Sequence, residues 1–88
     1  MKKQEKINEK RKQIEEIVMD IISNQSDISK DKLSNEANLQ TDINLDSLDI
    51  VEIVMELEDR LSISINEEHL EKFVTINNIV DYIERKVK

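Results

Sequence analysis

The sequence predicts an all-α fold, a small helical bundle of three main helices plus one short helix, with a long first loop. Apolar residues recur with helical spacing in three separate segments. Residues 62–66 alternate polar and apolar side chains like a short strand, but we find no partner strand for them elsewhere in the sequence. With 88 residues, the chain has room for one modest core. We therefore expect a single domain over residues 1–88, in which residues 1–13 form a polar N-terminal extension.

The first helix is predicted from residue 14 to about residues 23–26. Its apolar side chains recur at intervals of three and four, which is typical of one buried helix face. These are Ile14, Ile17, Val18, Ile21 and Ile22. Residues 1–13 are polar and rich in bases, and of two possibilities, a contact with a partner protein or a solvated helical lead-in to this helix, we favour the lead-in.

A long connection follows over residues 25–46. A connection of this length in a small domain usually packs or functions, and we expect Ile28, Leu33 and Leu39 to hold it to the core, with a short turn near residues 36–40. The chain contains no glycine and no proline. Its turns must therefore be made by Asn, Asp and Ser, which tolerate turn conformations through their short polar side chains.

The second helix is predicted over residues 47–61. Asp46 or Ser47 can cap its free amides, and Asp49 lies in the first turn, where the helix dipole favours an anion. Its apolar stripe is wider than one core contact needs, because Val51 and Met55 lie beside it. The stripe itself consists of Ile50, Ile53, Val54, Leu57 and Leu61.

The rest of the chain predicts a linker and two more helices. Residues 62–66 are expected to form an extended linker with Ile63 and Ile65 turned inward, followed by a short helix at 67–72. A last helix, capped by Thr75, is expected over residues 75–86. Its inward side chains are Ile76, Ile79, Val80 and Ile83.

The net charge of −7 lies entirely in the second half of the chain. Residues 1–41 hold eight acids and eight bases, whereas residues 42–88 hold twelve acids and five bases. Such a surface repels nucleic acid and anionic membranes and favours basic protein partners, although an acidic surface also serves solubility alone. The absence of cysteine excludes disulfides and thiolate zinc sites. No apolar run is long enough to span a membrane, and we expect a cytoplasmic monomer with no membrane insertion.

The candidate functional residue is Ser47, in the run NLDSLD at residues 44–49. It stands at a helix start with acids on both sides, and the sequence places no catalytic base beside it. The only histidine, His69, falls in the short helix and is expected to be a surface or cap residue. A serine hydroxyl is a poor nucleophile without a base, so the pattern favours a site modified by another enzyme. Taken alone, Asp-Ser before an apolar-periodic run is also an ordinary capping signal.

The acids near Ser47 raise the alternative of a divalent-cation site. Asp42, Asp46, Asp49 and Glu52 lack the oxygen-ligand spacing and the central glycine of a calcium loop. We therefore expect no metal site.

The run DSLDIVEIVMELED at residues 46–59 resembles the prosthetic-group attachment site of acyl carrier proteins, and the resemblance extends from about Ile14 to Ile83. It implies a helical-bundle carrier, not an enzyme, in which 4′-phosphopantetheine is joined to Ser47 by a phosphopantetheinyl transferase and carries acyl groups as thioesters. Asn44 stands where the family favours glycine, and Asn66 where it often has proline. Asn44 can take a left-handed conformation at modest cost.

The resemblance also implies two surfaces. One is a docking surface for the basic patches of partner enzymes, which include the enzymes of fatty-acid synthesis. Its expected residues are Asp46, Leu48, Asp49, Val51, Glu52, Met55, Glu58 and Asp59. The other is a lining for the acyl chain, expected at Ile53, Val54, Leu57, Leu70, Phe73, Ile76 and Ile79.

Three interpretations remain open on the sequence. The first is an acyl carrier for fatty-acid biosynthesis. The second is a specialised carrier loaded with polyketide, aminoacyl or other acyl groups, whose attachment site would look the same. The third is a non-carrier acidic helical interaction domain, in which Asp46 and Ser47 only cap a helix.

Overall fold

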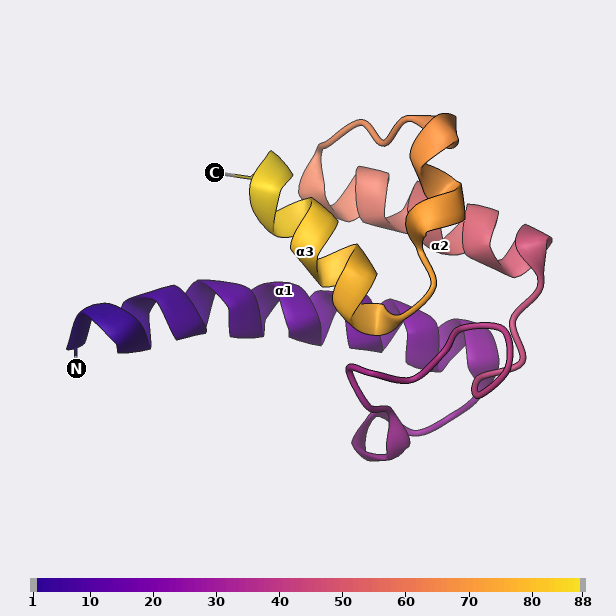
Figure 1. The fold of residues 1–88 in the computed structure, drawn as a ribbon, viewed down its shortest axis with the longest axis horizontal. Helices are drawn as coiled ribbons and strands as arrows, with labels where there is room; N and C mark the ends of the chain where they lie inside the picture. Colours follow the sequence, from indigo (N-terminus) through magenta and orange to yellow (C-terminus); the bar gives the residue numbers. More distant parts are fainter. Residues whose placement is uncertain (1, 88) are drawn as a thin grey trace.

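The structure is a computed structural model that describes the backbone of residues 2–87 and the side chains of residues 9–87. Within these residues the chain forms three α-helices and two short 3-10 helices. The elements are α1 (Lys2–Ser26), η1 (Lys30–Lys32), α2 (Ser47–Leu61), η2 (Glu67–Lys72) and α3 (Ile76–Lys86). Figure 1 shows α2 and α3 lying along the same side of α1. No strand forms within residues 2–87. The all-α prediction, with three main helices, a short helix at 67–72 and a long first loop, is confirmed, whereas η1 was not expected.

The core is made almost entirely of branched aliphatic side chains. Each helix contributes residues spaced three or four apart, so that its apolar face meets the other two helices. Ile17 and Leu61, which the periodicity places on these faces, are half-buried at their edges. The buried residues of the helices are Ile14, Val18, Ile21 and Ile22 of α1, Ile50, Ile53, Val54 and Leu57 of α2, and Ile76, Ile79, Val80 and Ile83 of α3.

The lead-in to the first helix is helical but is not wholly solvated. The backbone is helical from Lys2 onward, and the side chains of residues 1–8 lie outside those that the structure describes. The guanidinium of Arg11 pairs with Asp81 and Glu84 of α3 at 2.8 and 2.9 Å and also donates to Asn77 at 2.8 Å. The expectation of a purely solvated lead-in is therefore wrong at Arg11, because this side chain ties α1 to α3.

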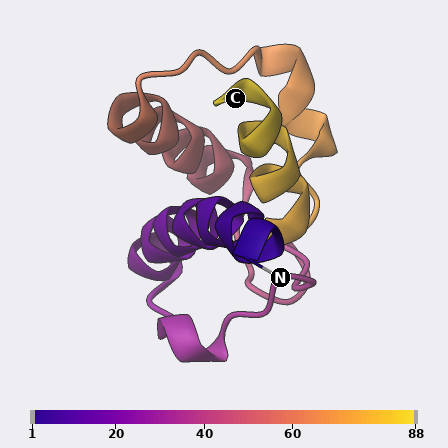
Figure 2. The ribbon, with the colours of Figure 1, turned by 90° about the vertical axis from the view of Figure 1, so that its left-hand side faces the viewer.

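The long connection is held to the start of α3 by backbone hydrogen bonds. The amide of Leu39 donates to the carbonyl of Val74 at 2.9 Å, and the amide of Asn77 donates to the carbonyl of Asn35 at 2.8 Å. Leu39 is fully buried, as expected, but Ile28 and Leu33 are only half-buried. Seen along α1 in Figure 2, most of this connection lies on the side of α1 opposite to α2, and its end rises past α1 to join the start of α2.

Within residues 2–87, three positions take the left-handed backbone conformation that glycine usually provides. They are Asp27, Asn44 and Ser62, with φ of 63°, 68° and 53°. Asp27 follows α1, Ser62 closes α2, and Asn44 lies three residues before α2. The prediction that Asn, Asp and Ser make the turns of this chain is confirmed. Beyond Ser62 the linker is extended, with Ile65 buried and Ile63 half-buried as expected.

Candidate functional site

Ser47 is the first residue of α2, and its side chain is exposed. The position before it is the helix cap. Asp46 accepts a hydrogen bond from the backbone amide of Asp49 at 3.0 Å, and Asp49 accepts one from the amide of Asp46 at 3.0 Å. Because Asp46 carries the capping role, the hydroxyl of Ser47 is not needed to cap the helix.

The turn that leads into Ser47 is held in place by a left-handed residue and by a buried leucine. Asn44 supplies the positive φ of 68° that reverses the chain. Leu45 is buried in the core, and its amide donates to the carbonyl of Leu39 at 2.9 Å. Ser47 therefore lies between a buried leucine and the first turn of a capped helix.

Beyond Ser47, α2 shows an exposed surface that combines apolar and acidic side chains. Leu48 is 73% exposed, Met55 60% and Val51 39%, although large apolar side chains are usually covered. Of the eight residues expected on the docking surface, Asp49 and Glu58 are half-buried. The exposed ones are Asp46, Leu48, Val51, Glu52, Met55 and Asp59.

Three of these acids have partners within the molecule that the sequence does not reveal. Gln25, at the end of α1, donates through Nε2 to Asp49 Oδ1 at 3.0 Å and to Glu52 Oε1 at 2.6 Å. Glu58 accepts a hydrogen bond from the amide of Ile65 at 2.8 Å. The hydrogen bond from Gln25, followed by those from Asp46, lowers the pKa of Asp49 below its ordinary value.

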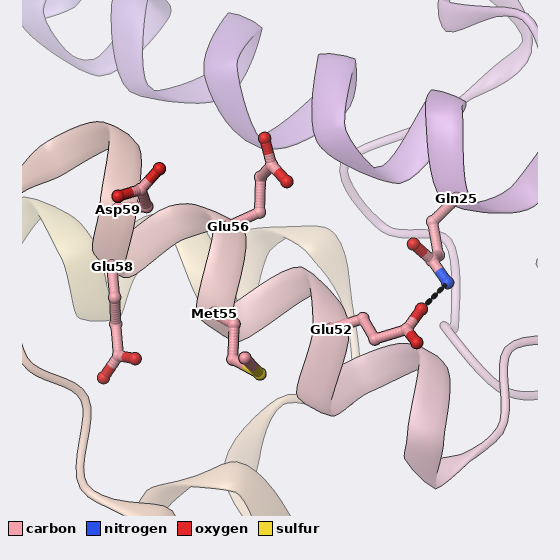
Figure 3. Close-up of a pocket in the computed structure, with 6 residues that line it drawn as sticks. All are labelled: Gln25, Glu52, Met55, Glu56, Glu58 and Asp59. Atoms are coloured by element: carbon pink, nitrogen blue, oxygen red, sulfur yellow. Dashed lines mark hydrogen bonds between the residues drawn. The ribbon is translucent and has the colours of Figure 1, made fainter.

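An open hollow follows the acidic side of α2. It is lined by Gln25, Glu52, Met55, Glu56, Glu58 and Asp59, which Figure 3 shows as sticks. Five of these six residues belong to α2, and Gln25 of α1 closes one end. The exposed methionine among carboxylates gives this hollow both apolar and anionic character, which suits a partner whose surface is basic around an apolar centre.

The residues expected to line an acyl chain fall into two groups. Val54 and Leu70 line a hollow of about 470 Å³ between α2 and η2, together with Val51, Met55, Glu58, Ile65 and Glu67. The other five expected residues are buried within the closed core, namely Ile53, Leu57, Phe73, Ile76 and Ile79. The structure thus places a hollow of mixed polarity beside Val54 and Leu70, while the other five residues are packed in the core.

His69 lies in η2 and contacts α3 rather than solvent alone. Its Nδ1 lies 2.6 Å from the hydroxyl of Tyr82, and the two rings meet edge to face with centroids 5.1 Å apart. Phe73 meets the same tyrosine ring in a second edge-to-face contact. These contacts fasten the short helix η2 to α3.

Two other features are absent among the described residues. No group of three or more His, Asp or Glu side chains there is arranged to hold a metal ion. No helix that the structure describes is long and apolar enough to cross a membrane.

Comparison with known proteins gives a consistent result. The family model for the phosphopantetheine attachment site matches residues 16–83. The acyl carrier protein of Chlorobium phaeobacteroides is 40% identical over 74 residues, which cover 84% of this chain and 95% of that protein. The acyl carrier protein of Buchnera aphidicola subsp. Acyrthosiphon pisum is 40% identical over 75 residues, covering 85% and 94%. Because the family model spans most of the chain and both relatives are 40% identical to it, the chain belongs to the acyl carrier protein family, whose prosthetic group is 4′-phosphopantetheine.

Proposed function

We propose that this chain carries acyl intermediates of fatty-acid biosynthesis as thioesters on a 4′-phosphopantetheine arm attached to Ser47. The observation that carries the proposal is the position of Ser47, exposed at the first residue of α2 while Asp46 supplies the helix cap. Its hydroxyl is therefore free of a structural duty. When attached, the arm supplies a terminal thiol that holds the acyl group.

The loading step joins Ser47 to phosphopantetheine taken from coenzyme A. The serine oxygen forms a new bond to the phosphorus next to the pantetheine, and the bond between that phosphorus and the bridging oxygen of the diphosphate breaks. The adenosine 3′,5′-bisphosphate portion leaves, and the hydroxyl proton passes to a base. A serine hydroxyl needs such a base to react. We propose that a phosphopantetheinyl transferase supplies it and that this chain is not itself an enzyme.

The exposed side of α2 is the proposed docking surface for the transferase and for basic patches on fatty-acid synthesis enzymes. Leu48 is the most exposed large apolar side chain of α2 and lies next to Ser47. Opposite charges speed the encounter of two proteins and set their orientation, while a central apolar contact supplies close packing. We further propose that the chain works as a cytoplasmic monomer, with the hollow beside Val54 and Leu70 as the entrance for an acyl chain.

Intact-mass measurement tests the attachment. The wild-type chain, incubated with coenzyme A and a phosphopantetheinyl transferase, is expected to gain one phosphopantetheine, and Ser47→Ala none. Ser34→Ala, which removes another exposed serine, is the matched control and is expected to load like the wild type. An unmodified wild type would favour the non-carrier interaction domain. The mass of the group recovered on the chain from its own cells separates a fatty acyl carrier from one specialised for polyketide or aminoacyl groups.

A further inference from the structure

Gln25 is a neutral side chain that holds two carboxylates of α2 from the neighbouring helix. Its amide nitrogen donates to Asp49 Oδ1 at 3.0 Å and to Glu52 Oε1 at 2.6 Å. Figure 3 shows the amide of Gln25 reaching from α1 to the carboxylate of Glu52. An amide nitrogen carries two N–H donors, which is enough for one hydrogen bond to each carboxylate.

The two acids that Gln25 joins are like-charged neighbours on one helix face. Asp49 and Glu52 are three residues apart in α2, a spacing at which side chains of equal charge repel. A lysine or arginine between them would hold them together but would also cancel part of their charge. The glutamine holds both side chains in place and leaves their negative charge available to a partner.

The same contact reaches the attachment residue through the helix cap. The second carboxylate oxygen of Asp49 accepts a hydrogen bond from the backbone amide of Asp46. Asp46 is the residue directly before Ser47 in the chain. The hydrogen bond from Gln25 is also the largest cause of the lowered pKa of Asp49. Gln25 thus supports both the start of α2 and the ionised state of its first-turn acid.

We propose that Gln25 is a positioning residue that holds the carboxylates of Asp49 and Glu52 in a fixed arrangement beside Ser47, ready to receive cationic side chains of the transferase that loads it. This inference rests on the proposed function of Ser47. Two side chains fixed in advance lose less conformational freedom when a partner binds. The benefit falls on the binding of the transferase and not on the chemical step.

Steady-state loading kinetics with Gln25→Met test the proposal. Methionine keeps the length of the side chain and removes both donors. The expected result is a KM for the carrier that rises about three- to tenfold, with kcat within about twofold of the wild type. The matched control is Gln13→Met, the same change at an exposed site of α1, which is expected to keep the wild-type KM. Gln25→Ala serves as a second variant. It removes the same donors, and alanine favours the helical conformation strongly.

A double-mutant cycle separates positioning from direct contact with the transferase. If Gln25 acts through the carboxylates, the rise in KM caused by Gln25→Met shrinks in a Glu52→Gln background. An undiminished effect in that background overturns the proposal, because Gln25 would then touch the transferase itself. An unchanged KM in both Gln25 variants, or a loss confined to kcat, also overturns it. In each of these cases the wild type still loads at Ser47 and the proposed function stands, whereas failure of the wild type to load refutes the proposed function.

Discussion

Asp46 and Asp49 cap the start of α2 for each other, each accepting the backbone amide of the other at 3.0 Å. Ser47 and Leu48 lie between them in the sequence. This reciprocal pair fixes the first turn of the helix without using the serine. It leaves Ser47 free for the proposed modification and makes the stability of this helix start depend on pH.

The first prediction concerns that pH dependence. Hydrogen bonds from Gln25 and then from Asp46 lower the pKa of Asp49 below its ordinary value of 3.8. A carboxyl with a lower pKa in the folded state stabilises the fold above its unfolded pKa, and this contribution is lost as pH falls through the folded pKa. Asp49→Asn is therefore expected to lower the free energy of unfolding at neutral pH, and its difference from the wild type is expected to shrink below about pH 3.8.

Urea unfolding from neutral pH to about pH 2.5 measures this difference. Asp59→Asn is the matched control, because it removes one carboxylate from the exposed end of the same helix. It is expected to leave stability at neutral pH unchanged or slightly raised, since an acid near a helix C-terminus is unfavourable. A gap between Asp49→Asn and the wild type that does not vary with pH would contradict the assigned role of Asp49.

The second prediction concerns docking by charge. Glu52→Lys reverses an exposed charge on the proposed docking surface and is expected to lower kcat/KM for loading about tenfold at low salt. Because salt screens charges over roughly 8 Å at physiological ionic strength, the loss should be smaller there. Glu16→Lys makes the same charge change on an exposed position of α1 and should have little effect. Equal losses in the two variants, or a loss indifferent to salt, would rule out this surface.

The third prediction concerns the turn before Ser47. Asn44 has a φ of 68°, which places a side chain with a Cβ in the left-handed region. Asn tolerates this region better than alanine, so Asn44→Ala is expected to cost about 1 kcal/mol of unfolding free energy. Asn44→Gly should stay within about 0.5 kcal/mol of the wild type, because freedom from strain offsets the greater entropy of the unfolded glycine. Chemical denaturation provides the measurement, and an alanine variant as stable as the wild type would disprove strain at this turn.

The fourth prediction concerns the hollow between α2 and η2. Each methylene moved from water into an apolar site contributes about 0.8 kcal/mol. Longer saturated acyl chains on the arm are therefore expected to raise the melting temperature above that of the unacylated form. Leu70→Phe, which fills part of this hollow, should reduce the gain. Identical melting temperatures for all chain lengths would indicate a closed core that admits no chain.

Much of this fold is local and could be predicted from the sequence. The bounds of α2 follow from its apolar period and from the acid before it, and the left-handed Asn44 follows from the lack of glycine. The link between Leu39 and Val74 could not be predicted, because it joins backbone groups 35 positions apart and leaves no local pattern. The same holds for Arg11, whose partners in α3 lie at the other end of the chain.

In the candidate site too, local features could be predicted from the sequence and contacts between distant segments could not. The exposed serine at a helix start and the acids of α2 are visible in the order of the residues. The amide of Gln25 is not, because a glutamine at the end of an amphipathic helix has no pattern that points to two carboxylates of another helix. The partner of Glu58, a backbone amide beyond the turn at Ser62, is equally hidden.

The most direct test of the central claim is the position of the modification within the loaded chain. Trypsin, which cuts after Lys32 and Arg60, releases a peptide of residues 33–60 in which the hydroxyl side chains are Ser34, Thr41 and Ser47. Fragmentation of this peptide by mass spectrometry assigns the group to one of them. We predict phosphopantetheine on Ser47 alone. Phosphopantetheine on Ser34, Thr41 or any residue outside this peptide would contradict it.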